Sequence, residues 1–397
     1  MPRQNVRDLS ISGDMGGHEG NTGVNTKSPL LDHCPPSLPA AWYHDPVHHG
    51  EELRRIHARN WIHIGRAEEF PAMTVRRIEV AGQNLIAVND PAGVIACFHN
   101  TCRHRGAELC AAPETKLKSK LITCPYHEWS YGLDGKLVRV PHATPSPDFR
   151  KEDHGLLPVH VKQWNGFVFV CLADDPPAFD AAPDMGAHAL DNWPMAELVI
   201  GHTWTHEIAC NWKIFWENFN ECLHCPGIHP ELCDLVPIYK HGIMAANEAA
   251  DWEPGMPSGT DLKPGATTWT MTGKPCGPEF PNLTAAERAR GQTFVTLWPT
   301  MYVVAHVDYA RAVTIRPLAP ERMEMRAQWL FPKSTLEAPG FDLENVTGFA
   351  TIVMKQDAEA SEMNQRGLKS SAFKHGRLMP QEFDVYNFQQ WVRKRLA

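Results

Sequence analysis

The sequence predicts an α+β protein, in which a small all-β domain is followed by a domain with an antiparallel sheet and flanking helices. Three observations predict this class: short β-rich runs separated by turns over residues 41–173, longer β-rich runs with short linkers over residues 294–331, and two helical patterns near the C-terminal end. The chain has 397 residues, of which 43% are hydrophobic, and this is enough for two cores.

The first part of the chain is expected to hold the β domain. Residues 1–30 are polar and rich in Gly, Asn and Ser, so we expect a mobile segment there, and residues 41–173 follow as the domain. Leu133-Asp-Gly-Lys136 has the residues of a hairpin turn. The expected strands cover residues 80–88, 94–98 and 166–172.

Residues 174–397 are expected to form the second domain. The linkers Asp308-Tyr-Ala310 and Leu318-Ala-Pro-Glu321 are short enough for an antiparallel meander. A Pro/Gly-rich excursion over residues 226–281 precedes the meander. The expected strands cover residues 202–208, 294–307, 312–317 and 323–331, and the expected helices cover residues 212–224, 342–368 and 382–396.

The bulk composition limits the classes of function. The formal net charge of -8 argues against a nucleic-acid partner and mildly favours a cationic small molecule. No apolar run is long enough for a membrane span, and no signal-peptide pattern opens the chain. Eleven cysteines, an odd number, without an export signal favour a cytoplasmic protein, in which clustered Cys and His indicate metal binding rather than disulfides.

Two Cys–His pairs form the first candidate metal site: Cys102-Arg-His104, and then Cys124-Pro-Tyr-His127. Zinc accepts such ligands, but zinc motifs usually open with two cysteines spaced by two to four residues. The pattern suits a [2Fe–2S] cluster in which one iron binds two thiolates and the other binds two imidazoles. Unrelated loop residues are the alternative. The nearby Cys97 is interpreted as a packed thiol, and so is Cys110.

The second candidate site lies near the middle of the chain. On a helix over residues 212–224, Glu217, Glu221 and His224 share the face opposite a bulky apolar face. A solvated polar face is the alternative. Pro226-Gly227 would stop this helix and let His229 turn back toward His224.

A third ligand is expected from the helix over residues 342–368. Asp357 lies within the apolar stripe formed by Val346, Phe349 and Val353, where an ionised carboxylate is costly unless it is paired or binds a metal. Two histidines and one carboxylate form the facial triad of Fe(II) enzymes that activate O₂.

The motifs around both sites resemble those of Rieske non-haem iron oxygenases. Asn100-Thr-Cys-Arg-His-Arg-Gly106 and the segment of residues 124–132 are similar to the cluster-binding loops of that family. Asn211-Trp-Lys213, residues 217–229 and residues 356–368 are similar to its iron-binding segments. The resemblance covers about residues 40–397. It implies a Rieske [2Fe–2S] domain and a helix-grip-like catalytic domain, with a cluster on Cys102, His104, Cys124 and His127 and with Fe(II) on His224, His229 and Asp357.

The resemblance also implies roles for residues that are not ligands. The acid three residues before the first histidine links the iron to a Rieske histidine of the neighbouring subunit, and here it is Glu221 where aspartate is usual. Glutamate at this position resembles the branch that acts on choline, glycine betaine, carnitine and stachydrine-type compounds. Asn218 is expected near the iron or in a capping or packing role, Trp129 beside the cluster or in the core, and Cys222 and Cys225 in packing.

The function implied is that of a terminal oxygenase. It would use O₂ to hydroxylate or N-demethylate a quaternary ammonium or other N-methylated small molecule; the alternatives are oxidation of an aromatic acid and electron carriage without an iron site. No Gly-x-Gly-x-x-Gly follows a strand, so a separate flavin and iron–sulfur reductase is expected to oxidise NAD(P)H. A homotrimer, or a multiple of it, is implied. The aromatic residues expected to line the pocket, or to pack, are Trp269, Phe294, Trp298, Tyr302 and Tyr309.

Overall fold

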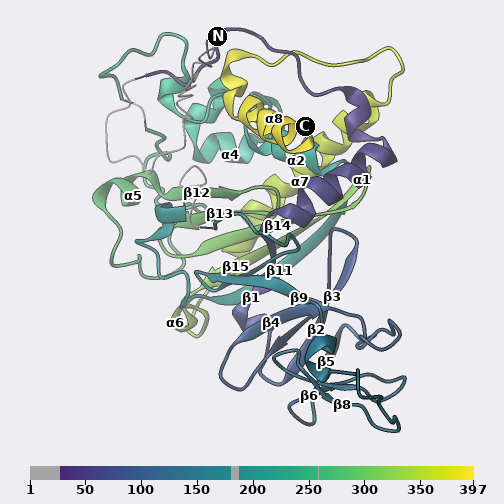
Figure 1. Ribbon diagram of the computed structural model, residues 1–397. Helices are drawn as coiled ribbons and strands as arrows, with labels where there is room; N and C mark the ends of the chain where they lie inside the picture. The colour runs from purple at the N-terminus through teal and green to yellow at the C-terminus, as the bar shows by residue number, and fades with distance from the viewer. Residues whose placement is uncertain (1–26, 180–186, 258) are drawn as a thin grey trace, which may run out of the picture.

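The computed structural model describes residues 27–179, 187–257 and 259–397. The mobile segment expected over residues 1–30 therefore lies almost wholly outside the described residues. Within the described ranges the structure has two main antiparallel sheets and a group of helices, as the α+β class predicts (Figure 1).

The first sheet has seven strands in the order β1-β10-β9-β4-β3-β2-β5. Its strands are β1 (Ile62–Arg66), β2 (Thr74–Val80), β3 (Gln83–Asn89), β4 (Ile95–His99), β5 (Glu114–Lys116), β9 (Pro158–Trp164) and β10 (Phe167–Cys171). The single strand expected over residues 80–88 is wrong, because the chain turns at Ala81 and Gly82, which both have positive φ, and pairs β2 with β3.

A small three-stranded sheet lies at the far end of this region, as Figure 1 shows. It contains β6 (Leu121–Thr123), β7 (Ser130–Gly132) and β8 (Leu137–Arg139). The hairpin turn expected at residues 133–136 is confirmed, since it joins β7 to β8.

The second main sheet has five strands in the order β11-β15-β14-β13-β12. They are β11 (Val199–Ile208), β12 (Gln292–Leu297), β13 (Met301–His306), β14 (Ala310–Ala319) and β15 (Arg322–Phe331). The single strand expected over residues 294–307 is wrong, because Trp298-Pro299-Thr300 forms a turn that splits it into β12 and β13. The antiparallel meander is confirmed.

Helices cover one face of the five-stranded sheet (Figure 1). Those that pack on it are α2 (Trp212–Phe219), α7 (Leu343–Leu368) and α8 (Phe383–Leu396). The other helices are α1 (Pro46–Arg55), α3 (Cys225–Ile228), α4 (Pro230–Leu235), α5 (Ala285–Arg290) and α6 (Lys333–Leu336). Asp342 caps α7 by accepting a hydrogen bond from the backbone N–H of Asn345 at 3.1 Å, so the predicted start of this helix is confirmed.

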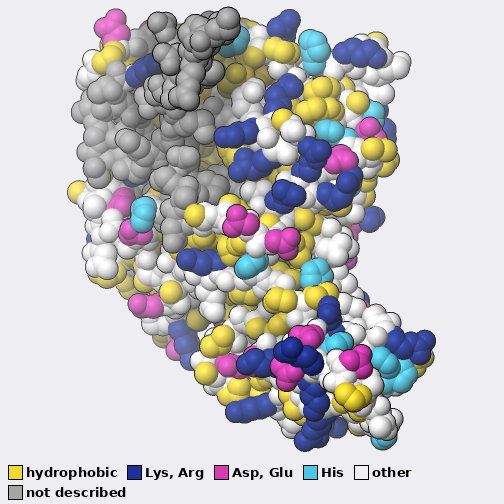
Figure 2. Space-filling view, in the orientation of Figure 1, with side chains coloured by type: hydrophobic (Ala, Val, Ile, Leu, Met, Phe, Trp, Pro, Cys, Tyr) yellow, Lys and Arg dark blue, Asp and Glu magenta, His cyan; other side chains and the backbone are white. Residues whose placement is uncertain are grey.

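The first part of the described chain lies beside the C-terminal region. Residues 35–40 run along residues 374–378 through backbone hydrogen bonds, including one from Ala40 N to Lys374 O at 2.8 Å. Arg55, at the end of α1, donates to the carbonyl of Leu396 in α8 at 2.8 Å. Figure 2 shows basic side chains gathered over this part of the surface. Helix α1 therefore packs with helix α8, although the hydrogen-bonded residues Arg55 and Leu396 are 341 positions apart.

Candidate metal centres

The four residues of the two Cys–His pairs come together on two loops at the end of the β region. Cys102 follows β4 and Cys124 follows β6, and both thiols are buried. His104 is exposed and His127 is half-buried, with their ring centroids 4.7 Å apart. Trp129 stacks on His104 at 4.7 Å, so this tryptophan lies where a cluster would need shielding.

The donor set fits a [2Fe–2S] cluster with chemically different irons. The thiols form an inner pair and the imidazoles an outer pair, which is the division that such a cluster requires. Burial raises the pKa of the Cys102 thiol, the Tyr131 hydroxyl at 3.1 Å opposes the rise, and the neighbouring Cys124 thiol adds to it. Cys97 and Cys110 are buried in the core, as expected of packed thiols.

The three predicted iron ligands converge at one point. His224 Nε2 lies 3.1 Å from His229 Nε2, and Asp357 Oδ1 lies 2.9 Å from His229 Nε2 and 3.5 Å from His224 Nε2. Atoms at right angles around a metal, with bonds of roughly 2.1 Å, would lie roughly 3 Å apart. The three atoms therefore have the spacing of a facial triad.

The carboxylates of Asp357 and Glu221 make the site of the two histidines favourable for a cation. Burial lowers the pKa of His224, but hydrogen bonds to Asp357 and Glu221 outweigh burial and raise it to about 10. Asp357 itself has a lowered pKa, because the two histidines overcome the effect of its burial. The carboxylates thus hold a positive charge in the site, and a divalent metal supplies that charge better than a proton does.

Two side chains orient the histidines from behind. Glu221 Oε1 accepts from His224 Nδ1 at 2.6 Å, and Gln356 Oε1 accepts from His229 Nδ1 at 2.8 Å. Gln356 in turn donates to Glu231 at 3.0 Å. Both histidines are therefore held as the tautomer that presents the Nε2 lone pair to a metal.

The helix expected over residues 212–224 is wrong at its C-terminal end. Helix α2 ends at Phe219, so Glu221 and His224 lie in the following loop rather than on one helical face with Glu217. Glu217 instead accepts from Tyr43 Oη at 2.6 Å and from Gln389 Nε2 at 3.0 Å. Burial raises the pKa of Glu217 to about 7.

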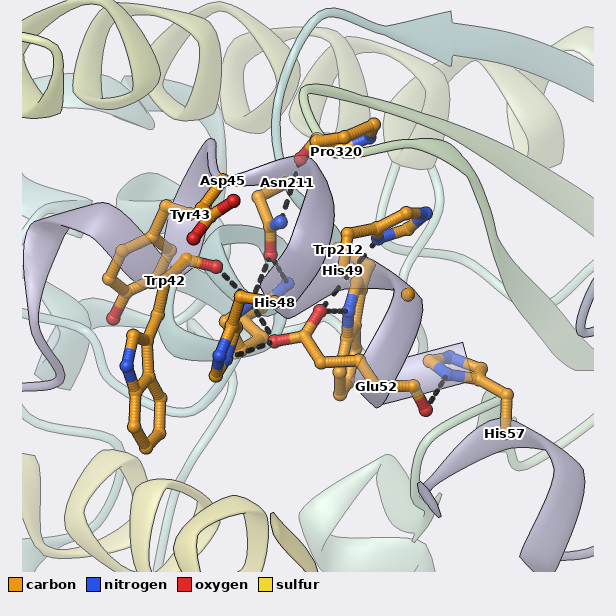
Figure 3. A network of polar contacts seen from close by, with 12 residues as sticks. Trp42, Tyr43, Asp45, His48, His49, Glu52, His57, Asn211, Trp212 and Pro320 are labelled. Atoms are coloured by element: carbon orange, nitrogen blue, oxygen red, sulfur yellow. Dashed lines mark hydrogen bonds and ion pairs between the residues drawn. The ribbon is translucent and has the colours of Figure 1, made fainter. Parts of the chain in front are cut away.

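A buried polar network anchors the start of α2 (Figure 3). Lys213 is fully buried and pairs with Glu52 of α1, and it also donates to Asn211 Oδ1 at 2.8 Å and Trp42 O at 2.9 Å. Trp212 Nε1 donates to the same Glu52 carboxylate at 2.9 Å. Burial opposes ionisation, but Lys213 and the adjacent histidines hold the pKa of Glu52 well below its usual range. The network fixes α2, and hence the loop that carries the iron ligands.

The structure joins Cys222 to Cys225 by a disulfide, which corrects the expectation of two packed thiols. Both residues are buried as expected, but the turn between them brings their Cα atoms to 5.0 Å, within the range that a disulfide spans. Asn218 is half-buried on the last turn of α2, and its side chain makes no hydrogen bond to any described residue.

Aromatic side chains gather between α2 and the five-stranded sheet. Phe219 lies against Tyr302 at 4.0 Å, Phe294 lies 6.1 Å from Phe219, and Trp269 lies 5.9 Å from Phe294. Trp298 is elsewhere, packed against α8 at 5.3 Å from Phe388. Among the described residues, no helix combines the length and apolar character needed to cross a membrane.

Comparison with known families settles the class. Residues 195–397 match the ring hydroxylating alpha subunit (catalytic domain) family, and residues 60–162 match the Rieske [2Fe-2S] domain. The chain is a Rieske oxygenase alpha subunit. Rieske oxygenases of this type carry a [2Fe–2S] cluster and a mononuclear iron, and the enzyme is a non-haem iron oxygenase, as the sequence motifs predict.

Relatives of this Rieske oxygenase match it along most of its length. The glycine betaine monooxygenase oxygenase subunit of Chromohalobacter salexigens is 30% identical over 386 residues, covering 89% of this chain and 84% of that protein. The chloroplastic choline monooxygenase of Spinacia oleracea is 26% identical over 377 residues, covering 92% of this chain and 78% of that protein. A crystal structure of the quaternary ammonium Rieske monooxygenase CntA with L-carnitine has the same fold, with a TM-score of 0.67, 20% identity, and coverage of 92% of this chain and 96% of that one.

The sequence motifs do not predict two features around the metal site of this Rieske oxygenase. Gln356 adjoins Asp357 in sequence, so its place beside the metal site could have been suspected, but its contact with His229 depends on how α7 meets α4. The pairing of Glu52 with Lys213 joins residues 161 apart. The only sequence signal for it was a lysine beside the bulky apolar face of α2.

Proposed function

We propose that the chain is the terminal oxygenase of a system that oxidises a quaternary ammonium or other N-methylated small molecule. The observation that carries the proposal is the similarity, over about nine-tenths of the chain, to an oxygenase subunit of glycine betaine monooxygenase. Glu221, where aspartate is usual in the family, supports the same branch. Oxidation of an aromatic acid is the competing function that the test below addresses.

The proposed reaction inserts one oxygen atom into an N-methyl C–H bond. One O₂, two electrons and two protons convert the N–CH₃ group to N–CH₂OH and release one water. The hemiaminal then collapses to the tertiary amine, formaldehyde and a proton. When bound, the mononuclear iron supplies O₂ activation and the cluster supplies electrons one at a time.

We propose that the ligands are those that the motifs indicate. Cys102, His104, Cys124 and His127 hold the cluster, and His224, His229 and Asp357 hold the iron. The convergence of the last three atoms within 3.5 Å supports this assignment. Asn218 lies on the helical turn before the ligand loop, where it can line the approach to the iron.

Glu221 is proposed to link the iron to the cluster of a neighbouring subunit in a homotrimer. Within one chain the cluster loops and α7 lie at opposite ends, with both main sheets between them (Figure 1). This layout supports electron transfer between subunits. Light scattering on the purified protein tests the trimer, and a monomer that turns over at full rate would contradict it.

The proposal also covers the domain limits, the electron donor and the cellular location. The proposed division is a Rieske domain within residues 41–173, whose strands begin at Ile62, and a catalytic domain over residues 174–397, on which α1 also packs. The family matches at residues 60–162 and 195–397 are compatible with this division. A separate reductase, containing flavin and an iron–sulfur centre, delivers electrons from NAD(P)H in the cytoplasm.

The aromatic group near the proposed iron ligands is the proposed binding site for the cationic end of the substrate. Phe219 and Tyr302 are in contact, 4.0 Å apart at their ring centroids, and they form an aromatic group with Phe294 and Trp269. A ring face of this group that is not covered by another ring can attract a desolvated trimethylammonium head by cation–π interaction, worth on the order of 2 kcal/mol. Such a seat would bring an N-methyl group, rather than the other end of the molecule, toward the iron.

A substrate panel tests the proposed function. Glycine betaine, choline, carnitine and a set of aromatic acids are supplied with a surrogate reductase, and NADH-dependent formaldehyde release is measured. We expect formaldehyde from at least one quaternary ammonium compound and none from the aromatic acids. Oxidation of an aromatic acid alone, with no formaldehyde from any quaternary compound, would replace the proposal by the competing function.

A further inference from the structure

Arg311 lies near the start of a strand of the five-stranded sheet, on the face that the helices cover. It lies on β14, the middle strand, and its register partners are Val304 on β13 and Trp329 on β15. Side chains alternate along a strand, so Arg311 shares its face with Val313, which belongs to the core cluster between the sheet and the helices. Helix α2, which precedes the proposed iron loop, is the helix that contacts β14.

No described residue neutralises this arginine. Arg311 is 5% exposed, its Nε is buried without an acceptor, and its guanidinium makes no hydrogen bond or ion pair with any described side chain or backbone group. Arg316 on the same strand differs in this respect, because it pairs with Glu324 at 3.1 Å. Arg66, another buried arginine, donates to the carbonyl of Leu198 at 2.7 Å. A buried guanidinium without an anion is costly, so the position calls for a ligand.

Other unpartnered polar atoms lie in the same region. The indole N–H of Trp269 is buried without an acceptor, and His306 Nδ1 is buried without a partner. The rings of Trp269 and His306 lie 5.7 Å apart. Burial lowers the pKa of His306 well below its usual range, and Arg311 lowers it further, so His306 stays neutral and adds no competing charge. Guanidinium and indole N–H are both donors, and what they lack is an acceptor with negative charge.

Tyr302 connects this region to the metal site. Tyr302 lies on β13, two residues from Val304, the register partner of Arg311, so its ring is on the same face of the sheet as the guanidinium. The same tyrosine touches Phe219, 4.0 Å between ring centroids, on the helix before the iron loop. Tyr302 is therefore close both to the strand of Arg311 and to the helix that precedes the proposed iron loop.

We propose that Arg311, with the indole N–H of Trp269, binds a carboxylate of the substrate, so that the substrate is a betaine: a zwitterion with an N-methylated cation at one end and a carboxylate at the other. This inference rests on the proposed function and narrows its substrate class. The carboxylate pairs with the guanidinium on the sheet side of Tyr302. The cationic head then lies on the iron side of that ring, where an N-methyl group meets the metal.

The arrangement separates betaines from choline. Both kinds of compound have a trimethylammonium head, but choline ends in a hydroxyl and would leave Arg311 without a counter-charge. A site built around a buried polar group rejects a ligand that leaves it unpaired, by factors that reach roughly 10,000. We expect a preference of at least about 100-fold in kcat/KM for glycine betaine or a longer betaine over choline.

The test compares substrates and variants on the holoenzyme. Glycine betaine, γ-butyrobetaine and choline are measured by formaldehyde release and, independently of turnover, by calorimetric binding to the anaerobic protein. Arg311→Gln should weaken binding of the preferred betaine by at least about 100-fold, mainly through KM, and should narrow or abolish the preference over choline. Arg311→Lys should retain part of the preference. Trp269→Phe, which keeps the ring and removes the N–H, should lose a smaller factor, on the order of 10-fold.

Arg316→Gln is the matched control, since it removes an arginine from the same strand whose charge already has a partner, and it should leave the preference unchanged. Rieske absorption and circular dichroism report whether Arg311→Gln folds, and Arg311→Lys serves if it does not. Equal use of choline and betaines by the wild type, or equal binding of betaine by wild type and Arg311→Gln, would overturn the inference. Oxidation of an aromatic acid alone, lost in Arg311→Gln, would refute the proposed function and the betaine assignment but keep Arg311 as a carboxylate site.

Discussion

The cluster site and the iron site of this chain differ in exposure and in the origin of their residues. The cluster residues come from two neighbouring loops, and His104 reaches the surface. The proposed iron ligands come from a loop and a helix, with His229 and Asp357 128 residues apart, and the side chains of these two residues are only 1% and 18% exposed. An exposed site suits electron transfer across a surface, whereas a buried site suits chemistry sheltered from water.

The groups that position the metal-binding side chains also differ between the two sites. Around the cluster, backbone turns and the Tyr131 hydroxyl position the thiols. Around the iron, a further layer of acids and amides positions the histidines, and a buried ion pair positions the helix before them. The proposed iron site therefore depends on more long-range contacts than the proposed cluster site does, and variants can test this difference.

The largest expected effect separates the two sites outright. His224→Ala removes one of the three proposed iron ligands, so we expect loss of mononuclear iron and a fall in turnover well beyond the roughly 10- to 100-fold typical of losing an outer-shell partner. The Rieske absorption should be unchanged. Iron content, visible spectra and formaldehyde release measure the outcome. Loss of the Rieske spectrum in this variant would show that the two sites are not independent.

A second variant tests the connection between the sites. Glu221→Gln keeps a hydrogen-bonding side chain beside His224 but removes the negative charge, so both metals should stay bound while electron transfer slows by about 100-fold. Stopped-flow reoxidation of the reduced cluster, with substrate and O₂ present, gives the rate. Glu382→Gln changes another acid near Glu221 and serves as the control. A wild-type rate in Glu221→Gln would remove Glu221 from the electron path.

The outer layer of the iron site should have a measurable effect of its own. Gln356→Leu takes away the acceptor that fixes the His229 tautomer, and we expect affinity for Fe(II) or Co(II) to fall by about 10- to 100-fold. Competition with a chelator measures this affinity. Glu231→Gln, one step further out, should lose only a few-fold, and Gln390→Leu, on the exposed surface of α8, should lose nothing. Equal affinities in all three variants would leave Gln356 with a packing role alone.

The smallest expected effect is a pH dependence of stability on the catalytic side. The pKa of Glu217 is about 7 in the folded chain against an ordinary 4.5, so folding holds a proton that the unfolded chain releases. Stability therefore falls as pH rises from about 4.5 to 7, by up to about 3 kcal/mol, and levels off above. Glu217→Gln cannot ionise and should escape this loss.

Denaturant unfolding at pH 5 and pH 8 measures the difference between variant and wild type. The stability of Glu217→Gln relative to wild type should rise between the two pH values. Glu337→Gln, an exposed acid on the surface, should show no such change. A constant difference for Glu217→Gln would mean that Glu217 is ionised in the folded chain at both pH values.

The motifs that indicate the family and the two candidate metal sites are local in the sequence. The Cys–His pairs, the histidine pair around Pro226-Gly227 and the wrong-face carboxylate of Asp357 are each visible within one short segment. So are the amphipathic helices near the C-terminal end. These patterns also identified the family and the fold class, because the spacing of ligands within a loop or along a helix is set by local geometry.

The features of the fold and the site that the sequence does not predict depend on contacts between distant residues. The end of α2 at Phe219 could not be predicted from helical periodicity, and it moved Glu217 away from the iron loop. Pro299 was a usable signal for the split between β12 and β13. Arg311 stands out in sequence as a charge within an apolar strand, but only the structure shows that no described group neutralises it.

The packing of α1 against α8 has a consequence for the design of chimeras in which domains are exchanged between relatives. Residues before about position 60 support α2 through Glu52, and the segment over residues 35–40 is hydrogen-bonded along residues 374–378. The electron-carrying module is thus inserted within the catalytic body rather than joined to its N-terminal end. A chimera cut once, near residue 174, would separate Glu52 from its matched Lys213. One cut twice, near residues 60 and 174, would transplant the module and leave that pair intact.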